Sequence, residues 1–130
     1  MDHPNIALVR GLYAAYMGGE AEALRAAFAP DVRWHNSGWD PTSGTLEGPD
    51  AVLGYLLGDN HMDDYALEVT DMLASDERVA IVARTSGTRD GRHIENDFVQ
   101  LIRIADGRVA EAWNYYWDQR ALAAFFAAAT

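Results

Sequence analysis

Apolar residues near the start of the chain recur at three- and four-residue spacing, which is the period of one helix face. They predict a helix that begins at Asp2 and Pro4, a capping acid followed by a first-turn proline, and that ends at Gly18. Glycine and proline delimit two further helical stretches, which are predicted over residues 20–28 and 49–57.

Beyond the third helix the pattern alternates with the period of strands. Asp90-Gly91 and Asp106-Gly107 each separate two such runs, and these dipeptides are the strongest short-range signal of a hairpin. The predicted strands lie at 31–36, 65–73, 79–88, 93–104 and 109–117, with a loop over 37–49 and a last helix from Asp118 to about residue 128. Helices followed by an antiparallel meander indicate an α+β fold, and the length favours one domain over residues 1–130.

The chain carries 20 acidic residues against 10 basic residues, all of them arginine, which gives a formal net charge of −10. This charge repels nucleic-acid phosphate and anionic lipid, so neither is an expected partner. The absence of cysteine and lysine excludes thiolate nucleophiles, cysteine-ligated zinc and Schiff bases. Because the sequence shows neither a signal peptide nor an apolar stretch of membrane-spanning length, we expect a soluble, cytoplasmic protein.

Motifs for metals and cofactors are missing from the sequence. The acidic stretch that holds Asp59, His61 and Asp63 lacks the spacing of a calcium loop. His93-Ile94-Glu95 lacks the cysteines that a deaminase zinc site needs. Nucleotide-binding loops and nucleophile elbows are absent as well, so we expect no metal and no cofactor.

Four segments, taken in order, resemble the SnoaL-like branch of the nuclear-transport-factor-2-like (NTF2-like) superfamily, which includes polyketide cyclases. The segments are ALVRGLYAAYMGGEAEALRAAFAPDVRWHN, LEGPDAVLGYL, TRDGR and LIRIADGRVAEAWNYYWDQRAL. The resemblance implies a cone-shaped α+β fold, usually dimeric, in which three N-terminal helices pack on a curved antiparallel sheet. It also implies a pocket between the helices and the concave face of that sheet. It does not define the reaction, because one fold can host many functions.

Alternation places Trp34 and Asn36 on the apolar side of the first strand and His35 on the other side. Similarity to ketosteroid isomerase puts Asn36 where that family keeps its aspartate base, and an amide cannot take up a proton. Limonene epoxide hydrolase has a Tyr-x-Asn at the matching place. We predict that Asn36 holds a water or a carbonyl, that Trp34 shapes the pocket, and that His35 is a candidate for proton transfer if a bulge turns it inward.

The strand at 79–88 is predicted to point its even-numbered residues inward, and these include Arg84 and Ser86. Epoxide hydrolases of this fold use Arg-x-Asp on the corresponding strand, whereas Arg84-x-Ser86 stands here and serine is a poor acid. A buried Arg84 needs a carboxylate partner from the protein or from a substrate. A solvated ion pair at the sheet edge is the alternative. The inward set is Ala80, Val82, Arg84 and Ser86.

Polar residues also stand on the apolar faces of the last two strands. Phe98 and Gln100 share a face, and Gln100 falls where ketosteroid isomerase has the protonated aspartate of its oxyanion hole. Its amide is a candidate donor to a carbonyl or enolate oxygen, and bonding within the core is the alternative. Asn114, Tyr116 and Asp118 share one parity, and Asp118 is a candidate acid or base as well as a candidate cap for the last helix.

Two tyrosines and one histidine complete the candidate site. Tyr13 and Tyr16 lie one turn apart on the first helix and are candidates for substrate contact through their hydroxyls. His61 follows the third helix, where a loop would fold over the pocket mouth, and histidine titrates near neutral pH. Core packing is the alternative for the tyrosines, and a surface position is the alternative for His61.

Together these residues predict a cofactor-independent enzyme that acts by proton transfer, as a cyclase or isomerase does, on a small, mostly apolar, carbonyl-bearing molecule. Gln100, Asn114 and Tyr116 would orient and polarise the oxygen. Asp118 or His35 would move the proton. The alternatives are an epoxide hydrolase, a non-catalytic small-molecule-binding protein, and a structural dimer whose cone is filled by its own aromatic residues.

The strand from Phe98 to Ile104 is apolar on both faces, whereas a strand with one solvated face alternates cleanly. One face is expected to cover the helices or a pocket. The other is expected to cover the last helix or a partner. Homodimerisation through the sheet follows as a hypothesis.

Overall fold

The computed structural model describes residues 3–38, 43–58 and 63–127. Within these ranges the chain forms four helices and six strands. The helices are α1 (Pro4–Met17), α2 (Ala21–Ala27), α3 (Pro49–Leu57) and α4 (Gln119–Ala127). The strands are β1 (Phe28–Asn36), β2 (Gly44–Glu47), β3 (Asp63–Ala74), β4 (Arg78–Arg89), β5 (Arg92–Ala105) and β6 (Arg108–Tyr116). No helix among these residues is long and apolar enough to cross a membrane.

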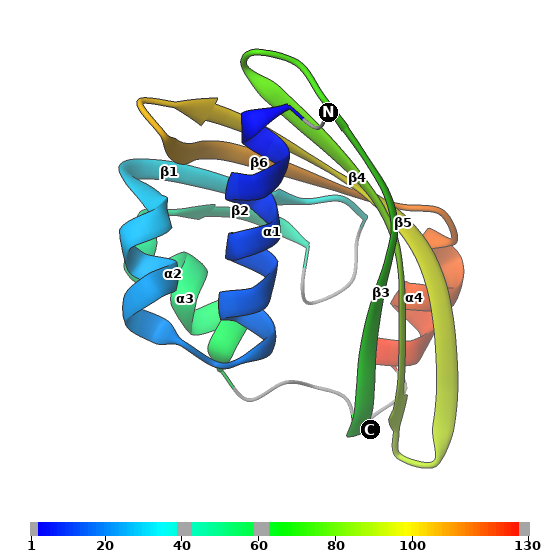
Figure 1. The fold of residues 1–130 in the computed structure, drawn as a ribbon. Coiled ribbons are helices and arrows are strands. Elements are labelled where there is room, and N and C mark those ends of the chain that lie inside the picture. The colour runs from blue at the N-terminus through cyan, green and yellow to red at the C-terminus, as the bar shows by residue number, and fades with distance from the viewer. Residues whose placement is uncertain (1–2, 39–42, 59–62, 128–130) are drawn as a thin grey trace.

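The strands form one sheet in the order β2-β1-β6-β5-β4-β3. Every neighbouring pair is antiparallel except β1 and β6, which run parallel, so the sheet is mixed and not antiparallel throughout as the sequence predicts. After β2 and α3 the chain crosses to the far edge of the sheet, then meanders back until β6 lies beside β1 (Figure 1). Hairpin signals describe consecutive strands only, and this parallel pair joins strands that are distant in sequence.

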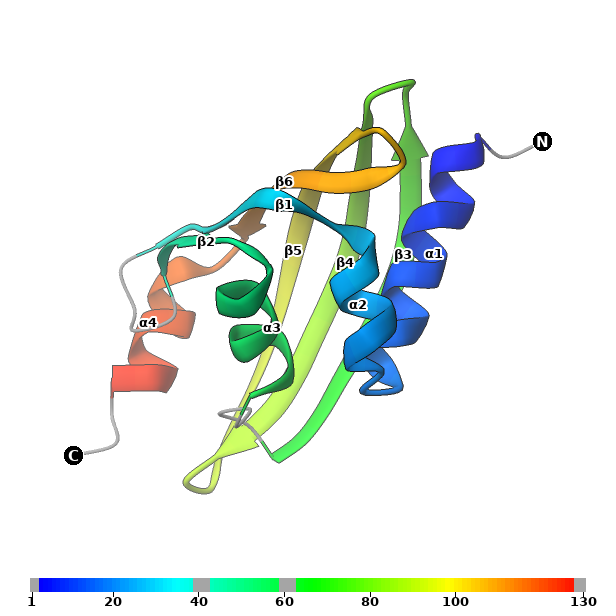
Figure 2. The same cartoon turned by 90° about the vertical axis from the view of Figure 1, so that its left-hand side faces the viewer.

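Helices α1, α2 and α3 lie on one side of a strongly bent sheet (Figure 1), and Figure 2 looks onto that side. The main core fills the space between them, with fully buried side chains from the helices, such as Leu24, and from the strands, such as Ile81 and Ile102. Each of these buried side chains stabilises the folded state by about 1.5–3 kcal/mol relative to leaving it exposed to water. The arrangement confirms the predicted α+β cone.

The turns that join β4 to β5 and β5 to β6 match their sequence signals. Asp90 and Gly91 have φ angles of 52° and 77°, and Asp106 and Gly107 have φ angles of 52° and 73°. Positive φ at both central residues is what a type I′ hairpin turn requires, and Asp-Gly supplies it at low cost. The two predicted hairpins are confirmed.

Local boundaries differ from the prediction in three places. Part of the predicted loop 37–49 is β2, which pairs antiparallel with β1 as a short edge strand. Phe28, predicted to end a helix, begins β1 because its buried ring belongs to the core. The N-cap of α1 is His3, whose ring nitrogen accepts a hydrogen bond from a backbone N–H at 3.1 Å, and Asp2 lies outside the described residues.

Helix α4 packs against the end of β5 through a second apolar cluster. Arg92 donates hydrogen bonds to the carbonyl oxygens of Ala124 and Phe125 at 3.2 and 2.9 Å, near the C-terminus of the helix. The guanidinium of Arg92 also lies over the Phe125 ring, 5.6 Å from its centroid. These contacts hold α4 at the end of the cone. The cluster consists of Ile94, Leu122, Phe125 and Phe126.

Candidate functional site

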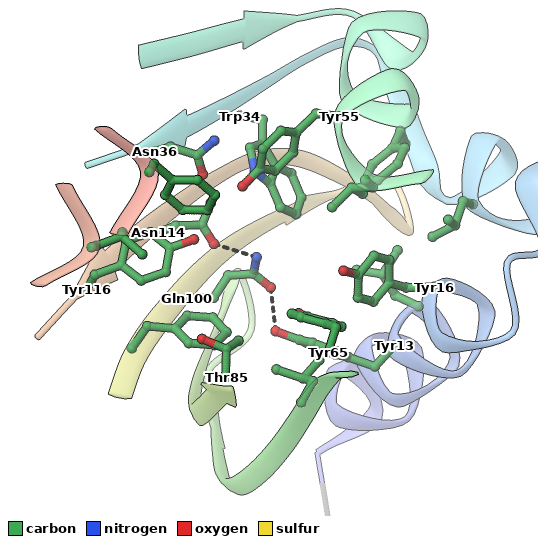
Figure 3. Close-up of a pocket in the computed structure, with 18 residues that line it drawn as sticks. Tyr13, Tyr16, Trp34, Asn36, Tyr55, Tyr65, Thr85, Gln100, Asn114 and Tyr116 are labelled. Carbon is green, nitrogen blue, oxygen red and sulfur yellow. Dashed lines mark hydrogen bonds between the residues drawn. The ribbon is translucent and has the colours of Figure 1, made fainter. Parts of the chain in front are cut away.

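A cavity of about 150 Å³ lies between the concave face of the sheet and the helices (Figure 3). Its 18 lining residues come from all four helices and from β1, β3, β4, β5 and β6. Aliphatic and aromatic side chains make up most of the wall, and its polar groups are hydroxyls, amides and one indole. An apolar cavity of about this volume holds a molecule the size of benzene.

A series of hydrogen bonds crosses the cavity wall from α1 to β1 through two buried amides (Figure 3). The hydroxyl of Tyr13 donates to Oε1 of Gln100 at 2.7 Å. Nε2 of Gln100 donates to Oδ1 of Asn114 at 2.7 Å, and Nδ2 of Asn114 donates to the backbone carbonyl of His35 at 3.1 Å. Each bond satisfies a polar group that would otherwise be buried at a cost.

The direction of these bonds follows from the last acceptor. A backbone carbonyl only accepts, so Asn114 presents its nitrogen to that carbonyl and its oxygen to Gln100. Gln100 must then donate to Asn114, which leaves Oε1 facing Tyr13, and the Tyr13 hydroxyl must donate in turn. The Tyr13 proton is therefore committed to the protein, and the lone pairs of its oxygen remain for a ligand.

Five tyrosines contribute to the cavity wall. Burial raises the pKa of Tyr13 and of Tyr65, and the neighbouring Tyr16 raises both pKa values further. The rings of Tyr16 and Tyr65 meet edge to face with their centroids 6.5 Å apart. Tyr13 and Tyr65 therefore stay protonated at neutral pH, and they act as hydrogen-bonding groups and not as bases.

Among the lining residues in the described part of the chain there is no Asp, Glu, His, Lys or Arg. A charged ligand would lose its hydration in this cavity without gaining a counter-charge. Nor do three His, Asp or Glu side chains gather anywhere in the described ranges as a metal site requires. The chemistry of the wall is that of neutral hydrogen bonding on an apolar background.

The structure brings eight of the predicted site residues to this cavity. Six of them lie there because the strands β1, β5 and β6 turn the predicted parity toward the helices, and the other two come from α1. Their roles in binding or catalysis stay predictions. The eight are Tyr13, Tyr16, Trp34, Asn36, Phe98, Gln100, Asn114 and Tyr116.

His35 lies on the opposite face of β1, where no bulge turns it inward. Its Nδ1 is 2.8 Å from Oγ1 of Thr45, its Nε2 is 2.6 Å from Oε2 of Glu111, and its ring stacks on Trp113. The hydrogen bond with His35 is the main cause that lowers the pKa of Glu111. These contacts tie together β1, β2 and β6, and they give no support to proton transfer by His35 in the cavity.

Arg84 lies on the outer face as well, which corrects the predicted inward set of β4. Its Nε donates to Oδ1 of Asp97 at 2.8 Å in an exposed pair, and this bond lowers the pKa of Asp97. Both parities of β4 are rich in apolar residues, so alternation did not distinguish them. The residues that do face inward are Val79, Ile81, Ala83 and Thr85.

Asp118 caps α4 and does not line the cavity. Its Oδ1 accepts from the backbone N–H of Ala121 at 2.9 Å, the pattern of a helix N-cap. Its own backbone N–H and carbonyl bond to the side chain of buried Asn96 at 3.1 and 3.0 Å. The capping interpretation of Asp118 is therefore the one that its contacts support. His61 lies outside the described residues.

Sequence reasoning missed three polar lining residues, Tyr55, Tyr65 and Thr85. Tyr65 shares the alternation of Leu67 on β3, so its inward position was readable from the period. Thr85 was missed because the even-numbered residues of β4 were predicted to point inward, whereas the odd-numbered residues do so. Tyr55 stands on α3 next to the lining residue Leu56, and no sequence signal marks it.

The fold and the cavity define a class of protein, an NTF2-like cone that encloses a small-molecule pocket. A family model described as SnoaL-like domain matches residues 9–112. The chain belongs to this family.

The chain is similar over nearly its whole length to other proteins. An uncharacterized protein of Mycobacterium tuberculosis is 30% identical over 129 residues, which cover 97% of this chain and 98% of that protein. The crystal structure of an NTF2-like protein from Burkholderia xenovorans is 28% identical with a TM-score of 0.83, covering 94% of this chain and 95% of that one. TerC, co-crystallized with polyporic acid, is 20% identical with a TM-score of 0.80, covering 95% and 98%, and shares the fold.

Proposed function

We propose that this protein binds a small, uncharged and mainly apolar molecule in the cavity between the sheet and the helices. The composition of the wall carries this proposal, because the described lining residues are aromatic, aliphatic, hydroxyl-bearing or amide-bearing and none is charged. Apolar burial supplies the affinity of such pockets, and a few polar groups supply the orientation.

The bound molecule carries at least one oxygen, for which a carbonyl is the simplest candidate. Nε2 of Gln100 has two hydrogens, and Asn114 accepts only one of them. A carbonyl inside this wall would be held by donors such as this second N–H. A pure hydrocarbon would bury these polar groups without partners, at a cost.

Proton transfer on such a molecule, as in a cyclase or isomerase, is the second candidate. Gln100 favours it, because a donor in a desolvated wall stabilises a developing oxyanion. The described lining residues include no group that takes up a proton at neutral pH, since His35 and Asp118 lie elsewhere. Binding without chemistry is therefore the better supported conclusion. An epoxide hydrolase is less supported, because Asn36 and Arg84 lie on opposite faces of the sheet.

Acetophenone and benzoate test the proposal, because they have similar shapes and differ in charge. We expect calorimetric titration to show acetophenone binding at least about tenfold more tightly, a difference of ~1.4 kcal/mol. The affinity for acetophenone should be constant between about pH 6 and pH 8, where buried phenols stay neutral. Tighter binding of benzoate, or a step in acetophenone affinity across this range, would contradict a neutral pocket.

The strand β4 offers a matched pair of variants for this experiment. Thr85→Phe places a ring in the cavity, whereas Ser86→Phe makes the same change one residue away on the other face of the strand. Thr85→Phe should abolish acetophenone binding and Ser86→Phe should leave it unchanged. Loss of binding in both variants, or in neither, would place the ligand elsewhere.

We also propose that two copies pair through the convex face of the sheet. Leu73, Val99 and Tyr115 are 56%, 38% and 51% exposed there, although each stands on a β-strand. In the pairing register Leu101 pairs with Trp113, and Ala80 lies between Leu101 and Leu73. No helix among the described residues covers this patch, and patches of this kind mark interaction surfaces. We call it the outer apolar face, and it consists of Leu73, Val99, Leu101, Trp113 and Tyr115.

A further inference from the structure

The indole Nε1–H of Trp34 is a buried donor that meets no acceptor within the part of the chain that the structure describes. Trp34 is 4% exposed and lines the cavity. Its ring projects from β1 toward the same space as the amides (Figure 3). Buried donors in native proteins nearly always have a partner, so an unpaired one needs an explanation.

The neighbouring groups of the wall do not supply that partner. The ring of Phe28 meets the indole edge to face with the centroids 6.1 Å apart, which holds the indole in place but offers no acceptor. The amide oxygens of Gln100 and Asn114 accept from Tyr13 and from Gln100, and neither is a hydrogen-bond partner of the indole. In this arrangement of the described side chains, an acceptor for Trp34 can be supplied by a molecule that enters the cavity.

We propose that Trp34 is a ligand-recognition residue, whose Nε1–H donates a hydrogen bond to an acceptor oxygen of the bound molecule. This inference rests on the proposed function and narrows its ligand class. An indole N–H only donates and never carries charge, so it selects a ketone, aldehyde, ester or ether oxygen over a hydrocarbon of the same shape. The Tyr13 oxygen, whose proton is committed to Gln100, offers the complementary acceptor for a hydroxyl on the same ligand.

Acetophenone and ethylbenzene measure this hydrogen bond, because they differ mainly in the carbonyl oxygen. The ratio of their affinities should fall about fivefold from the wild type to Trp34→Phe, which is the size of one net hydrogen bond. Trp117→Phe is the matched control, because Trp117 is 86% exposed and follows β6 outside the cavity. It should leave the ratio unchanged.

A second measurement uses the wild-type protein and does not depend on the folding of a variant. The indole N–H resonance of Trp34 should move downfield when acetophenone is added and should stay in place when ethylbenzene is added. Each tryptophan gives one such resonance, and the resonance that disappears in Trp34→Phe identifies the one to follow. If Trp34→Phe does not fold, through-space contacts between the indole N–H and aromatic protons of the cavity assign the Trp34 resonance instead.

The outcomes separate this inference from the proposed function. If both probes bind but the ratio persists in Trp34→Phe, or the Trp34 resonance ignores acetophenone, Trp34 does not recognise the ligand and the pocket proposal stands. If the Trp34 resonance indicates a hydrogen bond to a trapped water and does not change when acetophenone is added, Trp34 likewise does not recognise the ligand. If neither probe binds, the proposed function fails and this inference fails with it.

Discussion

The hydroxyl of Tyr13 links α1 to β5 in the cavity wall, because it donates the hydrogen bond that Oε1 of Gln100 accepts. Tyr13→Phe keeps the ring and leaves Oε1 of Gln100 buried without that donor. We expect the variant to lose about 1–3 kcal/mol of unfolding free energy, the usual cost of an unsatisfied buried group. Urea denaturation followed by tryptophan fluorescence measures this loss.

Tyr115→Phe is the control for that prediction, because it makes the same change at a half-exposed ring. Surface changes of this size alter the unfolding free energy by less than about 0.5 kcal/mol. Equal stability of Tyr13→Phe and Tyr115→Phe would show that the Tyr13 hydroxyl is not needed to satisfy Gln100.

For single residues, inward positions were predictable from the sequence where a polar residue alternates with large apolar residues on the same face of a strand. Asn36 and Gln100 stand among large apolar residues at a spacing of two, which identified the buried face of β1 and β5. Arg84 was misplaced because Ala80 and Val82 are as apolar as the true inward residues of β4. The pairing of one polar group with another, such as Tyr13 with Gln100, depends on long-range packing and is not written in any local pattern.

At the level of secondary-structure elements, variants of Asp118, the N-cap of α4, can distinguish a structural role of this residue from a catalytic one. Asp118→Ala removes the side-chain acceptor of the first turn and should cost about 0.5–2 kcal/mol of unfolding free energy. Asp118→Asn keeps an acceptor of similar capping strength and should be within a few tenths of the wild type. Both are measured by thermal unfolding.

Ligand binding gives the decisive comparison between these two variants. Because Asp118 does not line the cavity, Asp118→Asn should bind acetophenone as the wild type does. Loss of binding or of a catalytic rate in Asp118→Asn with unchanged stability would show that Asp118 has a functional role in addition to capping α4.

Secondary structure was predictable for the elements with strong local signals and not for those that depend on distant partners. The Asp90-Gly91 and Asp106-Gly107 turns were identified from two residues each. By contrast, β2 is a strand because β1 offers it an edge, and its glycine-rich surroundings are typical of a loop. The parallel contact of β1 with β6 joins residues that lie about eighty positions apart, and no local rule reports it.

On the scale of the whole molecule, one sheet presents two chemically different faces. The concave face supplies the amides and aromatic rings of the cavity, while the convex face carries the outer apolar face between charged pairs such as Arg84 with Asp97. Both faces of β5 are apolar: Phe98 and Ile102 are buried on the concave side, and Val99 is 38% exposed on the other. If the outer apolar face is an interface, as proposed, a strand that serves both a pocket and an interface would not show the clean alternation of a half-solvated strand.

The proposed homodimer makes this division testable. Val99 lies within the outer apolar face, between Val82 and Tyr115 in the pairing register. Val99→Arg would bury an unpaired charge in the contact, so we expect the dimer dissociation constant to rise at least about tenfold, ~1.4 kcal/mol. Sedimentation velocity over a range of micromolar concentrations measures this dissociation constant.

Met17→Arg is the control, because Met17 is an exposed apolar residue at the end of α1, away from this face. A wild type that sediments with the mass of one chain throughout that range would remove the dimer proposal, and acetophenone binding by such a monomer would show that the cavity is complete within one chain.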